Sequence, residues 1–126
     1  MWGTVPAYSP ESALKLVHSL TLALVRETRP EGMEDFTLRQ LAILLTVYRE
    51  PPPHTVRGLA SRLQVSKPVI TRALDAMGKH ALISRRRDDA DRRNVIIQRT
   101  VKGVLFVEKL ADKMLELTRE TMEAGA

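Results

Sequence analysis

The sequence predicts a mainly α-helical protein with one small antiparallel β-hairpin, arranged as a winged helix-turn-helix with an additional helix at each end. Apolar residues recur at three- and four-residue spacing in five separate segments, as they do in helices that bury one face. Two of these helices are short and are separated only by residues 64–66, which is the spacing of a helix-turn-helix. The strand-like segments 82–87 and 94–100 follow directly, and residues 88–93 connect them as a turn.

The first predicted helix covers residues 10–29. Ser9 is a suitable N-cap, and Pro10 suits the first helical position. The apolar residues spread over more than one face, which favours a helix that packs against its own core and also against a partner subunit. A central position in the core is the alternative. The main stripe consists of Leu14, Val17, Leu20 and Leu24.

The second predicted helix begins after Thr37. Thr37 and Gln40 have the spacing of a capping box, and Phe36 and Leu41 have the spacing of a hydrophobic staple. Residues 51–53 are three consecutive prolines, which cannot continue a helix and therefore end it.

The two helices of the helix-turn-helix come next. The third predicted helix runs from about Thr55 to Leu63, and the fourth covers residues 67–80 with Ser66 as its N-cap. Val65 is apolar, and we expect it to pack between the two helices. The fourth helix has one apolar face and one polar, partly basic face. The apolar face consists of Ile70, Ala73, Leu74 and Met77.

The last predicted helix covers residues 101–122, with Thr100 as its N-cap. Its apolar stripe is again wide, as expected for a helix with two packing partners. Residues 1–126 are therefore predicted to form a single winged-helix domain. Residues 36–103 would be its DNA-binding core, and the helices 10–29 and 101–122 would be its dimerisation helices.

The composition argues against several classes of protein. The chain of 126 residues has no cysteine, which excludes disulfides and thiolate catalysis. No apolar run is long enough for a membrane span, and the N-terminus lacks the pattern of a signal peptide, so we expect a cytoplasmic protein without a membrane partner. His18, His54 and His80 share no metal-ligand spacing, and no glycine-rich phosphate loop is present. We therefore expect no metal, no cofactor and no enzymatic activity.

The net charge of +5 is unevenly distributed. Residues 54–102 contain 12 lysines and arginines against 4 acids, whereas the rest of the chain contains 8 against 11. A basic centre between slightly acidic ends is typical of a nucleic-acid site carried on a separate scaffold. An ordinary solvated basic surface is the alternative interpretation.

The start of the fourth helix carries residues that suit double-stranded DNA. A recognition helix fits the major groove, where its N-terminal residues reach base edges. Arg72 can donate two hydrogen bonds to guanine, and Pro68 and Thr71 can contact a thymine methyl group. Ser66 and the free amides of the first turn suit a phosphate. The predicted contacts are Ser66, Lys67, Pro68, Thr71 and Arg72; a generic exposed helix face is the alternative.

The hairpin, residues 85–99, is predicted to be a DNA-binding wing. Arg92 and Arg93 stand beside Asp91 at its tip. An arginine in a narrow minor groove is stabilised by the enhanced negative potential there, and an adjacent carboxylate can hold its guanidinium in one orientation. Because an unpaired acid at this tip would repel phosphate, we expect Asp91 to neutralise and orient an arginine.

The strand that leads to the wing tip carries three consecutive arginines, residues 85–87. Side chains alternate across a strand, and Arg86 is expected to face the DNA backbone. A solvated charge run on an exposed hairpin is one alternative. A cation site formed by Asp88, Asp89 and Asp91 is another, but the flanking arginines argue against it.

These segments resemble the MarR family of bacterial winged-helix transcription regulators. The resemblance covers roughly Phe36 to Gly103 and rests on FTLRQLAILLTVY, TVRGLASRLQVSKPVITRALDAM and LISRRRDDADRRNVIIQRT, followed by VKG. It implies that an Asp-x-Arg element at the wing tip, here Asp91 and Arg93, reaches the minor groove. It also implies a homodimer formed by the terminal helices and a candidate small-molecule effector.

Two features depart from the family pattern. Ala81 stands where family members usually carry glycine, and a left-handed backbone at this alanine would cost about 1 kcal/mol relative to glycine. A helix that ends earlier, near Gly78, is the alternative. The chain also ends about one helix before typical members do, which affects the expected dimer interface and any effector pocket near it.

The sequence therefore predicts a homodimeric, sequence-specific transcription regulator that binds double-stranded DNA. Helix 67–80 would enter the major groove and wing 85–99 the minor groove. The alternative is a winged-helix subunit of a larger transcription or replication complex, whose main partner is another protein; the early end of the chain favours this alternative.

Overall fold

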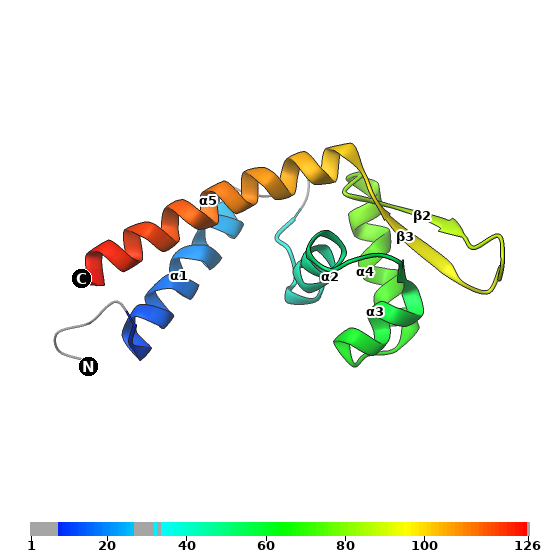
Figure 1. Cartoon of the computed structure of the whole chain (residues 1–126), viewed down its shortest axis with the longest axis horizontal. Helices are drawn as coiled ribbons and strands as arrows, with labels where there is room; N and C mark the ends of the chain where they lie inside the picture. Colours follow the sequence, from blue (N-terminus) through cyan, green and yellow to red (C-terminus); the bar gives the residue numbers. More distant parts are fainter. Residues whose placement is uncertain (1–7, 27–31, 33, 126) are drawn as a thin grey trace. The chain divides into compact units, whose positions relative to one another are not determined.

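The computed structural model describes residues 8–26, 32 and 34–125 of the chain (Figure 1). The chain consists of two compact units. Residues 36–107 form one, called here the winged-helix unit, and residues 1–35 together with 108–126 form the other, called the terminal unit. The long last helix contributes its first turns to the winged-helix unit and the remainder to the terminal unit.

The predicted fold class, mainly helical with a small antiparallel sheet, is confirmed. Figure 1 shows β2 and β3 projecting beyond the helices of the winged-helix unit as the predicted wing. The elements of this unit are α2 (Leu38–Arg49), β1 (His54–Thr55), α3 (Val56–Leu63), α4 (Lys67–Lys79), β2 (Ile83–Arg87), β3 (Val95–Arg99) and the start of α5 (Val101–Gly125).

The sheet contains one strand more than predicted. The strand order is β1-β3-β2, and both neighbouring pairs are antiparallel. In the pair of β1 with β3, His54 lies opposite Ile97 and Thr55 lies opposite Ile96. Two residues are too few to show the alternation by which a strand is recognised in a sequence. The predicted hairpin is therefore correct but incomplete, and the third strand joins the base of the wing to α3.

Caps fix the ends of α2 as predicted. The Thr37 hydroxyl accepts from the Gln40 amide, and the Gln40 side chain accepts from the Thr37 amide, both at 3.0 Å. This is the reciprocal capping box, which satisfies two amides that would otherwise lack partners. The helix ends at Arg49, directly before Glu50 and the prolines.

The core of the winged-helix unit anchors the recognition helix α4. Ile70, Leu74 and Met77 are fully buried along one side of it. Burial of one such side chain contributes about 1.5–3 kcal/mol. Because this face is committed to the core, the opposite face of α4 is the one that remains exposed. The same core cluster as the buried face of α4 also contains Ile43, Leu44, Val47, Leu59 and Leu82.

The turn between α3 and α4 also has the predicted length. Gln64 adopts a left-handed conformation with φ 58° and ends α3, and partly buried Val65 packs against the core. Ser66 occupies the N-cap position with an extended backbone, but its hydroxyl makes no capping hydrogen bond. The prediction of Ser66 as N-cap is thus correct for the backbone and wrong for the side chain.

Ala81 does take up a left-handed conformation, with φ 57°, and α4 ends at Lys79. The helix thus ends one residue beyond Gly78, and the left-handed conformation of Ala81 and an early end of the helix occur together. The Ala81 amide donates to the carbonyl oxygen of Gly78 at 3.0 Å, and the Ala81 carbonyl accepts from the Thr100 hydroxyl at 2.6 Å. These bonds hold a conformation that costs an alanine about 1 kcal/mol.

Tyr48 and Thr100 join the wing to the start of α5. The Tyr48 hydroxyl donates to the carbonyl oxygen of Leu82 at 2.5 Å and accepts from the Thr100 amide at 3.1 Å. The Thr100 hydroxyl accepts from the Gly103 amide at 2.9 Å, which confirms Thr100 as the N-cap of α5. We call these four residues the Tyr48 junction; it fixes the base of the wing against α2.

The terminal unit contains α1 (Pro10–Arg26) and the C-terminal part of α5. The Ser9 hydroxyl accepts from the Ser12 amide at 3.1 Å, so Ser9 is the predicted cap. Helix 10–29 was predicted, and residues 27–29 lie outside the described residues. The final helix extends to Gly125, three residues beyond the predicted end at 122. Among the described residues of this unit, the buried ones are Ser12, Ala23, Leu110 and Thr121.

Candidate nucleic-acid interface

The predicted contacts of the recognition helix lie together at its exposed N-terminal end. Ser66, Lys67, Pro68, Thr71 and Arg72 are all exposed. The Thr71 hydroxyl donates to the carbonyl oxygen of Lys67 at 3.1 Å, which leaves the Thr71 methyl group available for an apolar contact. This end of α4 therefore presents hydroxyl, ammonium, guanidinium and apolar groups side by side, the set of groups that base edges and phosphates require.

The wing tip contains the predicted pair of Asp91 and Arg93. One carboxylate oxygen of Asp91 accepts from the Arg93 backbone amide and from Arg93 Nε, each at 3.1 Å. The Arg93 side chain is 88% exposed, so the pair restricts its direction without burying it. A second turn bond joins the Asp88 carboxylate to the Ala90 amide at 2.9 Å. Two carboxylates of the tip thus stabilise its backbone by accepting hydrogen bonds from amides of the same turn.

The Asp91 carboxylate is ionised at neutral pH. The side-chain hydrogen bond from Arg93 is the main cause that lowers the pKa of Asp91 below its ordinary value, and the backbone hydrogen bond from Arg93 adds to it. The positive charge of Arg57, on α3, contributes further. A carboxyl with a lowered pKa keeps its pair above that pKa and loses it as the pH falls through it. The Asp91–Arg93 pair therefore persists through the neutral range.

Asp75 and Arg85 form an ion pair that the sequence did not predict. Arg85 Nη2 lies 2.8 Å from a carboxylate oxygen of Asp75, so β2 is joined to α4. The register between a helix and a strand depends on how the chain folds back, and no local pattern in the sequence reports it. The pair links the recognition helix to the wing and occupies one of the three arginines of β2.

Several other basic residues of the winged-helix unit are also engaged within the protein. Arg62 forms an ion pair with Glu50 at 2.8 Å, and Arg99 donates to the carbonyl oxygens of Val47 and Glu50 at 2.7 and 3.0 Å. Arg87 donates to the carbonyl oxygen of Arg92 at 2.9 Å, which braces the wing. These engaged residues are poor candidates for a ligand contact.

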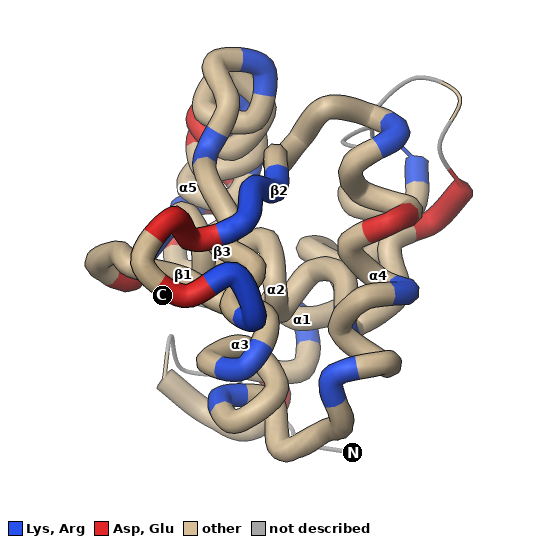
Figure 2. The backbone as a smooth tube through the Cα atoms, turned by 90° about the vertical axis from the view of Figure 1, so that its right-hand side faces the viewer, with Lys and Arg blue, Asp and Glu red and all other residues tan. Residues whose placement is uncertain are grey.

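Predicted Arg86 lies on the exposed part of β2 with one long contact, 3.4 Å from Nη1 to the carbonyl oxygen of Arg87. Arg92 and Arg93 are exposed at the tip. Figure 2 shows basic positions along β2 and at the wing tip, with acidic positions between them. Exposed basic groups of this unit thus lie on α4 and on the wing, and others lie on α2, α3 and α5.

Within residues 8–26, 32 and 34–125, no three His, Cys, Asp or Glu residues are grouped so that they could hold a metal ion. No helix in the same ranges is both long enough and apolar enough to cross a membrane.

The chain is similar in structure to solved transcriptional regulators and to a protein solved in complex with DNA. Tm0710 from Thermotoga maritima has a TM-score of 0.68 and 22% identity, over 92% of this chain and 79% of that one. BldR from Sulfolobus solfataricus has a TM-score of 0.62 and 26% identity, over 88% and 76%. Overoxidized AbfR, solved bound to DNA, has a TM-score of 0.63 and 23% identity, over 84% and 75%. No curated protein sequence matches the chain significantly.

The fold and the site define a winged helix-turn-helix protein with a basic recognition helix and a basic wing. Residues 36–95 match the model of the MarR family, and the chain has the fold of solved transcriptional regulators. The match ends at Val95 and so includes Asp91 and Arg93, the wing-tip residues that the sequence resemblance places in the minor groove.

Proposed function

We propose that the chain is a cytoplasmic, homodimeric transcription regulator that binds specific sequences of double-stranded DNA. The observation that carries this proposal is the presence, in one compact unit, of an exposed recognition-helix end and a wing tip whose arginine is oriented by a carboxylate. The DNA-bound state of the similar protein AbfR supports it. The enzyme alternative has no support from the relatives, which are regulators.

In this proposal α4 enters the major groove. Arg72 donates two hydrogen bonds to a guanine, and Pro68 and the Thr71 methyl group contact thymine methyl groups. The Ser66 hydroxyl makes no capping bond, so it is available to a phosphate together with Lys67. The buried side of α4 holds these groups in a fixed direction, because Ile70, Leu74 and Met77 are locked in the core.

The wing supplies the second contact. Arg93 enters the adjacent minor groove, where an arginine responds to groove width more than to base identity. Arg92 and Arg86 contact the flanking phosphates, and the Asp75–Arg85 pair keeps the wing at a constant position relative to α4. One protomer thereby reads one half-site through two grooves.

The direct test is a titration of the chain with duplex DNA at several salt concentrations. If Lys67, Arg86 and Arg92 contact phosphates, the logarithm of the binding constant should fall linearly with the logarithm of the salt concentration, by about 0.9 per phosphate contact. We therefore expect a slope of roughly −3 per protomer or steeper. Duplex affinity that is absent or independent of salt would instead favour a winged-helix subunit whose partner is a protein.

Homodimer formation rests on apolar surface that the terminal unit leaves uncovered. Leu14, Val17 and Leu115 are 55, 59 and 49% exposed, although they lie on helices with buried neighbours. Contiguous exposed apolar side chains are typical of interfaces between proteins. Leu110, by contrast, is buried within the unit. The apolar stripe that the sequence shows on α5 is thus divided between the core and the proposed interface.

We expect Val17→Asp to convert the dimer to a monomer without unfolding the chain. Burial of one aliphatic side chain contributes about 1.5–3 kcal/mol, and a buried unpaired carboxylate adds a further penalty. Sedimentation velocity would measure the assembly, and circular dichroism the fold. Lys15→Asp is the matched control, because Lys15 is exposed on the opposite side of α1 and should leave assembly unchanged. A dimer that tolerates Val17→Asp would contradict this interface.

A further inference from the structure

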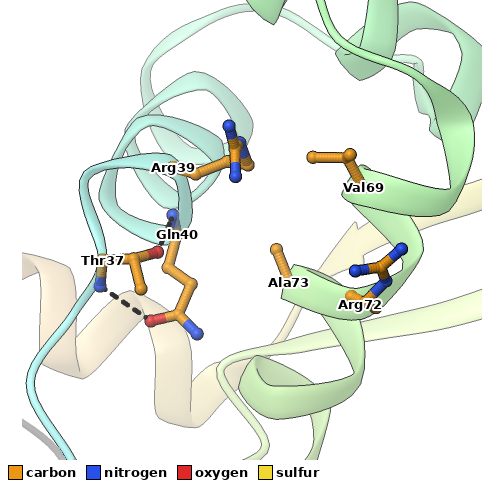
Figure 3. A pocket seen from close by; sticks show the side chains of 6 residues that line it. All are labelled: Thr37, Arg39, Gln40, Val69, Arg72 and Ala73. Carbon is orange, nitrogen blue, oxygen red and sulfur yellow. Dashed lines mark hydrogen bonds between the residues drawn. The ribbon is translucent and has the colours of Figure 1, made fainter.

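A hollow of about 210 Å³ lies between the first turn of α2 and the recognition helix α4. Figure 3 shows the side chains of Arg39, from α2, and Val69, from α4, facing it, and Arg72 lines it from α4. Both helices belong to the winged-helix unit, so the hollow is a feature of a single unit. Its lining consists of Thr37, Arg39, Gln40, Val69, Arg72 and Ala73.

The chemistry of this lining selects an anion. Two of its six residues are arginines, and none is acidic. Thr37 and Gln40 are uncharged, and their side-chain oxygens accept the hydrogen bonds of the capping box. The acids Glu34 and Asp35 precede the helix and do not line the hollow. The hollow is therefore lined by two guanidinium groups, one from α2 and one from α4, and by no carboxylate.

The position of Arg39 is unfavourable for the stability of α2. It is the second residue of the helix, and the first turn contains no acid. A cation near a helix N-terminus is repelled by the helix dipole. Arg39 is also exposed, so it adds little packing. Among the described residues, no acid of the first turn offsets this cost, whereas a bound anion would offset it.

We propose that the hollow receives the sugar–phosphate backbone of the DNA strand at the edge of the major groove, and that Arg39 contacts a phosphate there. This inference rests on the DNA binding proposed above and extends the interface from α4 to α2. Arg72 lines the hollow from α4, so it can reach the base edges next to that phosphate. The Arg39 contact fixes the position of α4 in the groove, and Arg72 reads a base.

Arg39→Gln tests this assignment, with Lys15→Gln as a control that removes the same charge from an exposed helical position in the terminal unit. Fluorescence anisotropy would measure affinity for a preferred duplex and for a scrambled one at several salt concentrations. For Arg39→Gln we expect a roughly five- to tenfold loss of affinity on both duplexes and a log–log salt slope smaller by about one unit. Arg39→Lys should retain most of the slope, and Lys15→Gln should leave it unchanged.

Two further readouts separate the possible outcomes. The melting temperature of Arg39→Gln should equal or exceed that of the original chain, because the substitution removes an unfavourable charge. Arg72→Ala, unlike Arg39→Gln, should reduce the preference for one duplex over the other. A slope and affinity unchanged in Arg39→Gln would overturn the Arg39 assignment alone, whereas no duplex binding by the original chain would overturn the proposed function with it. Benzoate serves as a small carboxylate probe in a separate titration of the original chain and of Arg39→Gln. If the original chain binds benzoate and Arg39→Gln loses this binding while it keeps its DNA affinity, the hollow is a site for a small carboxylate and the inference is rejected.

Discussion

Replacement of Gly103 by alanine is expected to lower the free energy of unfolding by about 3 kcal/mol, because the added methyl group has no room. A Cβ atom at Gly103 would overlap the Tyr48 hydroxyl and the carbonyl oxygen of Leu82, and it would lie 2.7 Å from Tyr48 Cζ. Relief requires the Tyr48 ring to move, which breaks its hydrogen bonds to Leu82 and Thr100. Each such bond contributes roughly 1 kcal/mol.

Gly78→Ala is the matched control for this prediction. Gly78 lies inside α4, and the nearest atom to a Cβ added there is Arg85 Nη2 at 3.8 Å, an ordinary contact. Because alanine favours a helix over glycine by about 0.5–1 kcal/mol, this substitution should stabilise the chain slightly. Thermal and urea unfolding would measure both variants. A Gly103→Ala variant as stable as the original chain would show that the Tyr48 junction is not tightly packed.

Replacement of Arg93 by alanine is expected to weaken binding to the preferred duplex about tenfold or more, with the loss concentrated at A·T-rich flanks. The narrow minor groove of such sequences attracts an inserted guanidinium. Arg92→Ala should instead weaken binding to all duplexes and reduce the log–log salt slope by about one unit. Anisotropy titrations on duplexes that differ only in their flanks would measure both effects.

The acids of the wing tip give the sharper comparison. Asp91→Ala should weaken DNA binding although it removes a negative charge, because the carboxylate holds the Arg93 guanidinium through Nε at 3.1 Å. Asp89→Ala removes the same charge from an exposed position in the same turn, and simple electrostatics predicts tighter binding. The two variants should therefore change affinity in opposite directions at equal salt. Tighter DNA binding by both variants would show that the wing binds DNA through its net positive charge and that Asp91 does not orient Arg93.

The sequence allowed prediction of those parts of the fold that depend on neighbouring residues. The capping box of Thr37 and the cap at Thr100 follow from short spacings, because a capping side chain bonds only to amides two or three residues away. The neighbouring residues alone do not decide whether Ala81 takes up a left-handed conformation. In the structure that conformation is held by the bond from the Thr100 hydroxyl to the Ala81 carbonyl oxygen, which joins residues 19 positions apart.

Most of the features that sequence reasoning missed join separate elements of the fold. Strand β1 exists because His54 and Thr55 pair with residues about 40 positions later. The Asp75–Arg85 pair and the contact of Tyr48 with Leu82 depend on tertiary packing in the same way. The hollow beside Arg39 is of this kind too, because α2 and α4 are separated in the chain by α3. Counting charges along the sequence shows where basic residues are frequent, but it does not separate the arginines that bond within the protein from those that are free to contact a ligand.

The most direct test of the central claim is a selection of bound sites from random duplex DNA. A dimer that presents one recognition helix and one wing per protomer should enrich a palindromic site. Its half-sites should be centred about one helical turn apart, or a multiple of that distance. The preference for A·T flanks outside the half-sites should disappear when the selection is repeated with Arg93→Ala. A pool without enrichment, or one enriched in a single unpaired half-site, would contradict the proposed mode of DNA recognition.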